Sequence, residues 1–136
     1  MDATDIKVLL EVGERISFEC KKAENNIPKS VWETYSSFAN TIGGIIVLGI
    51  TENVKFVGEA NHFEITGITN PQKLRKEFFD TLNSNKVNRN ILTDSDVEII
   101  DYEGVPLMCI TVPQADYRQR PIYINGNMMN GAFKRN

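Results

Sequence analysis

The tripeptide Glu19-Cys20-Lys21 has the residue types and the spacing to act on a phosphate group. Residues two positions apart on a β-strand share a face, so Glu19 and Lys21 should project together. Glu14 lies just upstream, and Glu52 follows an apolar segment at the carboxyl end of a predicted central strand. Three carboxylates can hold Mg²⁺ or Mn²⁺ through hard oxygen ligands while a lysine steadies the scissile phosphate. The pattern therefore fits a metal-dependent nuclease.

The same residues have a simpler interpretation. Short Glu-x-Lys matches often arise by chance. Glu19 and Lys21 would then form a surface ion pair worth under about 1 kcal/mol, and Glu14 would lie at a helix end. We favour this interpretation, or a role in binding only, over catalysis. ATP hydrolysis is not indicated, because Gly43-Gly44 precedes a strand rather than a helix and lacks the lysine of a phosphate-binding loop.

Apolar periodicity predicts the elements that position these residues. A helix from Ser30 to Thr41 should begin with a capping box, Ser30 to Glu33, and Gly43-Gly44 should end it. Ile45–Ile50 and Leu107–Val112 are apolar at nearly every position, which is typical of central strands covered on both faces. Two further helices are expected, one at Thr4–Val12 and one that starts at Asn70-Pro71. Three further strands are expected at Ile16–Cys20, Asp96–Asp101 and Ile122–Ile124. The expected fold is α+β, with helices packed on a mixed β-sheet.

Three segments resemble the Schlafen AlbA_2 domain family. They are Glu14–Lys21, Phe38–Gly44 with Leu48-Gly-Ile50, and the tail Arg120–Ile124 with Gly126-Asn127 and Gly131–Arg135. The resemblance implies a small α+β domain that binds nucleic acid and that often heads larger bacterial proteins resembling transcriptional regulators. In the Schlafen proteins proper, related carboxylates serve an RNA-cleaving site. Glu14 and Glu19 fit the two upstream acids of that pattern, and Glu52 is the third candidate.

The composition is that of a soluble globular protein of one domain, residues 1–136. We expect this domain to be the N-terminal part of a longer protein, because similar proteins commonly continue. No secretory signal or membrane-spanning run is visible, so we expect a cytoplasmic location and no membrane partner. Cys20 and Cys109 should be reduced, buried thiols.

The net charge of −3 argues against a uniformly basic nucleic-acid binder, but two segments are locally basic. Residues 71–90 hold five basic against two acidic side chains, and residues 115–136 hold four against one. Guanidinium groups pair with phosphate oxygens, and aromatic rings stack on unpaired bases. The side chains predicted to bind nucleic acid are Arg118, Arg120, Lys134, Arg135, Lys73 and Lys76. The alternative is that the two segments are separate solvated patches.

The leading hypothesis is a non-enzymatic DNA- or RNA-binding domain of a bacterial transcriptional regulator, which requires no cofactor. The second is an endoribonuclease of Schlafen type, dependent on Mg²⁺ or Mn²⁺ at Glu14, Glu19 and Glu52 with Lys21 beside them. A homodimer could supply the second lobe that such a nuclease needs. A third is an interaction or dimerisation module with no nucleic-acid role.

Overall fold

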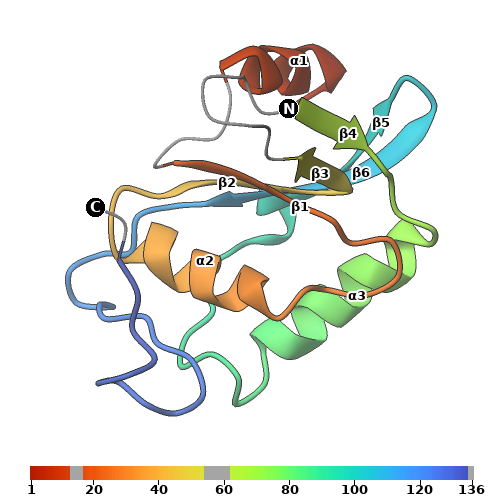
Figure 1. The fold of residues 1–136 in the computed structure, drawn as a ribbon. Helices are drawn as coiled ribbons and strands as arrows, with labels where there is room; N and C mark the ends of the chain where they lie inside the picture. Colours follow the sequence, from red (N-terminus) through yellow and green to blue (C-terminus); the bar gives the residue numbers. More distant parts are fainter. Residues whose placement is uncertain (13–16, 54–61, 135–136) are drawn as a thin grey trace.

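The fold is a mixed four-stranded sheet with helices on both faces (Figure 1). We describe it from a computed structural model for residues 1–12, 17–53 and 62–134. The strands are β1 (Phe18–Lys21), β2 (Gly44–Leu48), β5 (Val97–Tyr102) and β6 (Val105–Val112), in the spatial order β1-β2-β6-β5. β1 and β2 are parallel, and the other two pairs are antiparallel. The predicted α+β class is confirmed, with the two most apolar strands in the middle.

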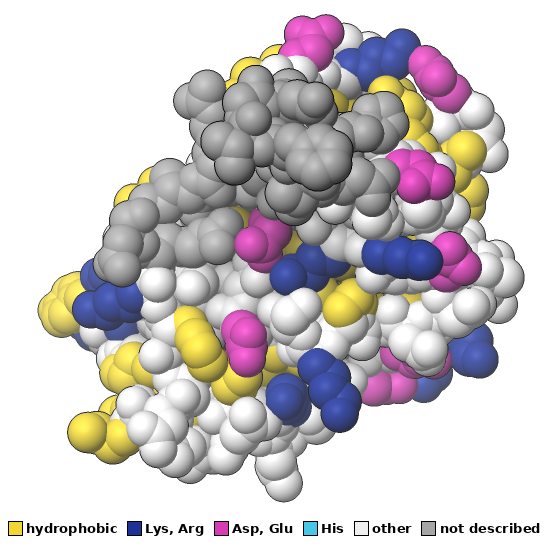
Figure 2. Space-filling model, viewed as in Figure 1, with side chains coloured by type: hydrophobic (Ala, Val, Ile, Leu, Met, Phe, Trp, Pro, Cys, Tyr) yellow, Lys and Arg dark blue, Asp and Glu magenta, His cyan; other side chains and the backbone are white. Residues whose placement is uncertain are grey.

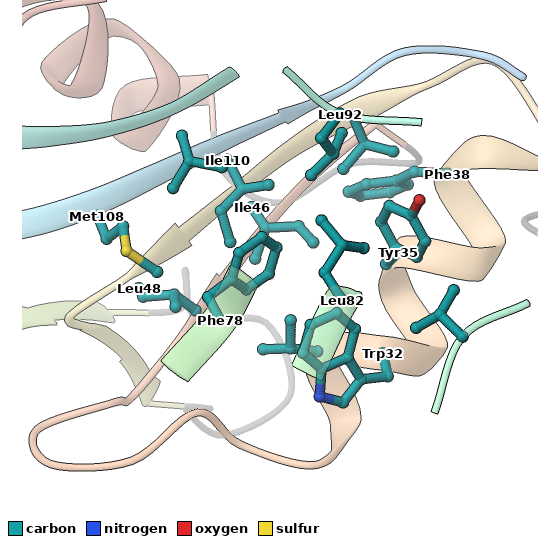
Figure 3. Packing of buried hydrophobic residues seen from close by; sticks show 14 of the residues in the cluster. Trp32, Tyr35, Phe38, Ile46, Leu48, Phe78, Leu82, Leu92, Met108 and Ile110 are labelled. Atoms are coloured by element: carbon teal, nitrogen blue, oxygen red, sulfur yellow. The ribbon is translucent and has the colours of Figure 1, made fainter. Parts of the chain in front are cut away.

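Helices α2 (Ser30–Ala39) and α3 (Pro71–Leu82) cover one face of the sheet. The main core lies between them and the sheet, where Trp32 stacks on Phe78 with ring centroids 5.0 Å apart (Figure 3). Leu74, Phe78 and Leu82 are buried, as the helical spacing predicts. The predicted start of α3 is also confirmed, because the Asn70 side chain accepts a hydrogen bond from the backbone N–H of Lys73.

Helix α1 (Ala3–Val12) covers the opposite face. Ile6 of α1 is buried in a smaller cluster that includes both cysteines, and neither cysteine forms a disulfide. Burial raises the pKa of the Cys109 thiol to about 12. Within the described ranges, no helix is long and apolar enough to cross a membrane.

Gly49 divides what the sequence predicted as one strand, Ile45–Ile50, into two. Its φ is 106°, a conformation that other residues rarely adopt, and an added Cβ would lie 2.8 Å from Leu107 Cδ2. The chain therefore leaves the main sheet after Leu48 and starts β3 (Ile50–Asn53), which among the described strands pairs only with β4 (His62–Ile65). Glu52 thus lies on a separate two-stranded sheet, not at the end of the central strand.

The capping box predicted at the start of α2 is not formed. Ser30 is the first helical residue, the cap position falls on Lys29, and no side chain caps the helix. Backbone carbonyls of Pro28 and Lys29 accept from the first N–H groups instead. This releases the Ser30 hydroxyl, which accepts a hydrogen bond from Lys21 Nζ at 3.1 Å.

The prediction of a strand at Ile122–Ile124 is also wrong. It makes only isolated bridges, from Ile124 to Val87 and from Tyr123 to Ala132. The end of α2 lies at Ala39 rather than Thr41, and Gly43, with φ of 79°, turns the chain into β2 as expected.

Candidate nucleic-acid interface

The C-terminal segment, residues 113–134, is fixed to the end of α2 by two buried polar side chains. Asn40 accepts from the Ile122 N–H and donates to the Ile122 carbonyl, both at 2.8 Å, and donates to the Phe133 carbonyl at 2.9 Å. Ser36 Oγ donates to the Ile122 carbonyl at 2.7 Å and accepts from the Phe133 N–H at 3.0 Å. One helix end thereby holds two stretches of chain that are eleven positions apart.

A second set of bonds joins this segment to the loop that follows α3. The Asn88 side chain accepts from the Tyr123 N–H at 2.7 Å, and Asn125 N donates to the Lys86 carbonyl at 2.9 Å. Lys86 Nζ also donates to the Asn125 side chain at 2.7 Å. The two locally basic segments found in the sequence are therefore in contact at this point, through Lys86 rather than through α3 itself.

A shallow pocket of about 560 Å³ opens beside the fixed segment. Its lining residues, which we call the basic pocket, are Asn40, Tyr117, Arg120, Pro121, Ala132 and Lys134. Arg120 and Lys134 are exposed, and neither makes an ion pair with any residue that the structure describes. Two cations without a neutralising partner face one hollow, which makes it attractive to an anion.

Tyr117 is the aromatic member of the basic pocket and is 69% exposed. Arg118 is placed against it: its guanidinium carbon lies 5.5 Å from the ring centroid, and its Nε donates to the Tyr117 hydroxyl at 3.2 Å. Hydrophobic and basic side chains stand out together over the C-terminal segment at the left margin of Figure 2. Arg135, also predicted to bind, lies outside the described residues.

The remaining predicted basic residues are on α3 and do not line the basic pocket. Lys76 forms an ion pair with Asp80 at 2.7 Å, and this hydrogen bond raises the pKa of Lys76. Lys76 lines a different pocket, and Lys73 is exposed on the same helix. Lys86, in contrast, bonds to Asn125 of the C-terminal segment. The charge count of residues 71–90 included Lys86, but spacing alone could not show which basic residue contacts this segment.

Glu19 and Lys21 do lie together, in a second pocket of about 250 Å³ between β1 and α2. Glu19 Oε2 accepts from Thr34 Oγ1 at 2.5 Å and lies 3.1 Å from Lys21 Nζ. The side chains of this strand–helix pocket come from Glu19, Lys21, Ser30, Glu33, Thr34, Ser37 and Phe133. The prediction from sequence did not include Glu33 or Thr34 in this site, because it assigned Glu33 to a capping box.

The donor set for a divalent cation is not complete in the part of the chain that the structure describes. There, no three acidic, cysteine or histidine side chains come together in a way that could hold a metal ion. Glu52 is not among the residues lining the strand–helix pocket, and Glu14 lies outside the described ranges. Glu19 is instead engaged by Thr34 and Lys21, so the metal site stays a prediction.

The two pockets share a wall. Ala132 and Lys134 line the basic pocket, whereas Phe133 between them lines the strand–helix pocket. Successive side chains of an extended chain point to opposite sides, which explains the division. The bonds of Asn40 and Ser36 to Phe133 therefore hold this wall in place for both pockets.

Comparisons with known proteins agree with this fold. A family model described as "Schlafen, AlbA_2" matches residues 14–136. The solution NMR structure of the N-terminal domain of a RecG-related protein from Nitrosomonas europaea is similar, with a TM-score of 0.76 and 27% sequence identity, over 100% of this chain and 89% of that one. No curated protein matches the chain.

Proposed function

The chain belongs to the Schlafen AlbA_2 family, and from this premise we propose that it is a nucleic-acid-binding domain whose basic pocket holds the sugar–phosphate backbone. The observation that carries the proposal is the convergence of Arg120, Lys134 and Tyr117 on one pocket. An arginine fork pairs with phosphate oxygens in a bidentate manner, and a lysine adds a point charge. The exposed ring of Tyr117 offers a surface on which a base can stack.

The distribution of charge supports binding at this place rather than over the whole surface. The chain carries a net charge of −3, yet residues 117–136 contain four basic and no acidic side chains. A local cationic site on an acidic protein orients a polyanion toward that site. We expect modest affinity, because few phosphates can be contacted by such a small site.

We further propose that the natural ligand is DNA. The name of the RecG-related protein refers to an ATP-dependent DNA helicase, and a domain shared with such a protein fits a DNA-acting assembly. The regulator role implied by the sequence resemblance is the narrower form of this proposal. It requires a second domain, such as a winged helix, to read sequence, because no recognition helix is presented by the basic pocket.

A salt titration tests the proposal. Fluorescence anisotropy with labelled single- and double-stranded DNA and RNA should show that log affinity falls linearly as log salt rises. Arg120→Ala and Lys134→Ala should each weaken binding by a similar factor for all sequences and lower the salt slope by about one. Lys7→Ala is a matched control, since Lys7 pairs with Glu103 on the α1 side of the sheet. Absence of binding at low salt, or a slope unaffected by both variants, would refute the proposal.

A metal-dependent endoribonuclease is the second candidate function. Its specific support is that Glu19 and Lys21 line one pocket that shares a wall with the basic pocket. It requires Glu14 and Glu52 to join Glu19 around Mg²⁺ or Mn²⁺, the ion that would supply Lewis-acid chemistry. RNA cleavage that depends on the cation and disappears in Glu19→Ala would support it, and cleavage that persists in this variant would exclude it.

A further inference from the structure

The loop of residues 125–131 presents two exposed methionines beside the basic pocket. Met129 is 85% exposed and Met128 is 54% exposed. Exposed large apolar side chains are normal when scattered singly, but here two adjacent ones form the tip of one loop. Neither methionine belongs to the two clusters of buried hydrophobic side chains. The packing of the core that the structure describes therefore does not account for their exposure.

The loop that carries them is tightly bonded. Asn127 Oδ1 accepts from the N–H groups of Met129 and Asn130 at 3.0 and 2.9 Å, and the backbone of Gly131 donates to Asn127 at 2.6 Å. Ile124 N in turn donates to the Gly131 carbonyl at 2.9 Å. The base of the loop is the bridge between Tyr123 and Ala132. A loop bonded in this way presents its tip in a defined position.

Positive charge flanks the tip at both ends. Lys86 bonds to Asn125 at the start of the loop, and Lys134 lies five residues after Met129. Five residues span at most about 18 Å, which is within the reach of a few nucleotides. Ala132, at the base of the loop, lines the basic pocket together with Lys134. A polyanion in the basic pocket would pass close to the two methionines.

We propose that the tip formed by Met128 and Met129 is an apolar wedge that inserts beside an unpaired or unstacked base of the bound nucleic acid. Apolar side chains, methionine among them, are used in this way by proteins that unstack base steps. The thioether sulfur also makes favourable contacts with aromatic rings. Unstacking costs least where a base is already unpaired, so the wedge gives preference for a bulge over a perfect duplex. This inference rests on the proposed function, since the basic pocket supplies the phosphate contacts.

The test uses two DNA duplexes that differ by one bulged 2-aminopurine, whose fluorescence reports stacking. The wild-type chain should bind the bulged duplex about 10-fold more tightly and change its fluorescence. The variant Met128→Gln/Met129→Gln, which keeps the unbranched side chains, should lose that preference and that fluorescence change but keep the salt slope. Val8→Gln is the control, because Val8 is a 54% exposed apolar residue on α1. Thermal melting should show that all variants are folded.

The two proposals fail differently. Equal preference for the bulge in the wild type and the double methionine variant, with a salt slope that still depends on Arg120 and Lys134, would overturn the wedge and leave the proposed function standing. Absence of DNA binding at low salt would overturn both. A further measurement uses anionic lipid vesicles. Vesicle binding that depends on the two methionines, together with no 2-aminopurine response in the DNA experiment, would also overturn the wedge and identify the tip as a membrane contact.

Discussion

Asn40 and Ile122 form a reciprocal pair in which the side-chain amide of Asn40 satisfies both backbone groups of Ile122, each at 2.8 Å. The two residues are 82 positions apart and are both buried. This pairing mimics that of two neighbouring strands, but it is made by one side chain at a helix end. It fixes the middle of the C-terminal segment, between Arg120 of the basic pocket and the methionine tip.

Asn40→Ala should therefore reduce both stability and nucleic-acid binding. It leaves the Ile122 N–H and the Phe133 carbonyl without their side-chain partner, and each buried unsatisfied group costs about 1–3 kcal/mol. We expect urea unfolding to show a loss of about 2–4 kcal/mol, with weaker DNA binding even in the folded fraction. Asn85→Ala, in the exposed loop after α3, should change neither quantity. Unchanged binding by folded Asn40→Ala would show that the pocket does not depend on this attachment.

The ion pair between Glu19 and Lys21 should be worth more than the one between Lys76 and Asp80. The side chains of Glu19 and Lys21 are 20% and 15% exposed, whereas those of Lys76 and Asp80, on one helix, are 77% and 62% exposed. Exposed pairs four residues apart on a helix contribute about 0.3–0.5 kcal/mol. Double-mutant cycles, with Glu19→Gln and Lys21→Met in one and Asp80→Asn and Lys76→Met in the other, should give the larger coupling for the strand–helix pocket. Equal coupling would mean that Thr34 and Ser30 do not order the pair.

Alkaline pH should destabilise the protein through two buried acids. Burial raises the pKa of Cys109 from 9.0 to about 12 and that of Tyr35 from 10.0 to about 12. The unfolded chain releases these protons at lower pH than the folded protein does. The stabilisation that these groups contribute is therefore fully present below pH 9. For each group, the free energy of unfolding then falls by about 1.4 kcal/mol per pH unit between the ordinary pKa of the group and its raised pKa. Urea unfolding at pH 8 and pH 10 should show that Cys109→Ala loses less stability over this interval than the wild type. An equal loss would place the Cys109 thiol in contact with solvent.

Gly131→Ala and Gly104→Ala should destabilise the protein for different reasons. A Cβ at Gly131 would collide with the carbonyl of Ile124, so the bonds that close the methionine loop must shift, at a cost of about 1–3 kcal/mol. Gly104 has open space around it but a φ of 87°, so alanine there suffers backbone strain alone, about 1–2 kcal/mol. Only Gly131→Ala should increase hydrogen exchange at the Ile124 amide. Equal exchange in both variants would show that the loop closes without the Gly131 contact.

Local sequence patterns determined the helices and most strands of this protein. The apolar spacing of Leu74, Phe78 and Leu82, and the cap at Asn70, depend on residues a few positions apart, so they could be predicted directly. The same applies to the pairing of Glu19 with Lys21 on one face of β1. Local features of this kind need no knowledge of distant contacts.

Tertiary structure decided which of the predicted site residues meet. Glu52 lies on another sheet because the chain turns at Gly49, whose φ is 106°, and Leu107, 58 positions away, leaves no room for a side chain at that turn. Asn40 looks like an ordinary polar residue at a helix end, yet it sets the position of Arg120 and Lys134 by holding Ile122 and Phe133. Ser30 binds Lys21 rather than capping its own helix, since backbone carbonyls already serve that end. Each of these outcomes depends on contacts between different elements of the fold, and such contacts leave no periodic signal along the chain.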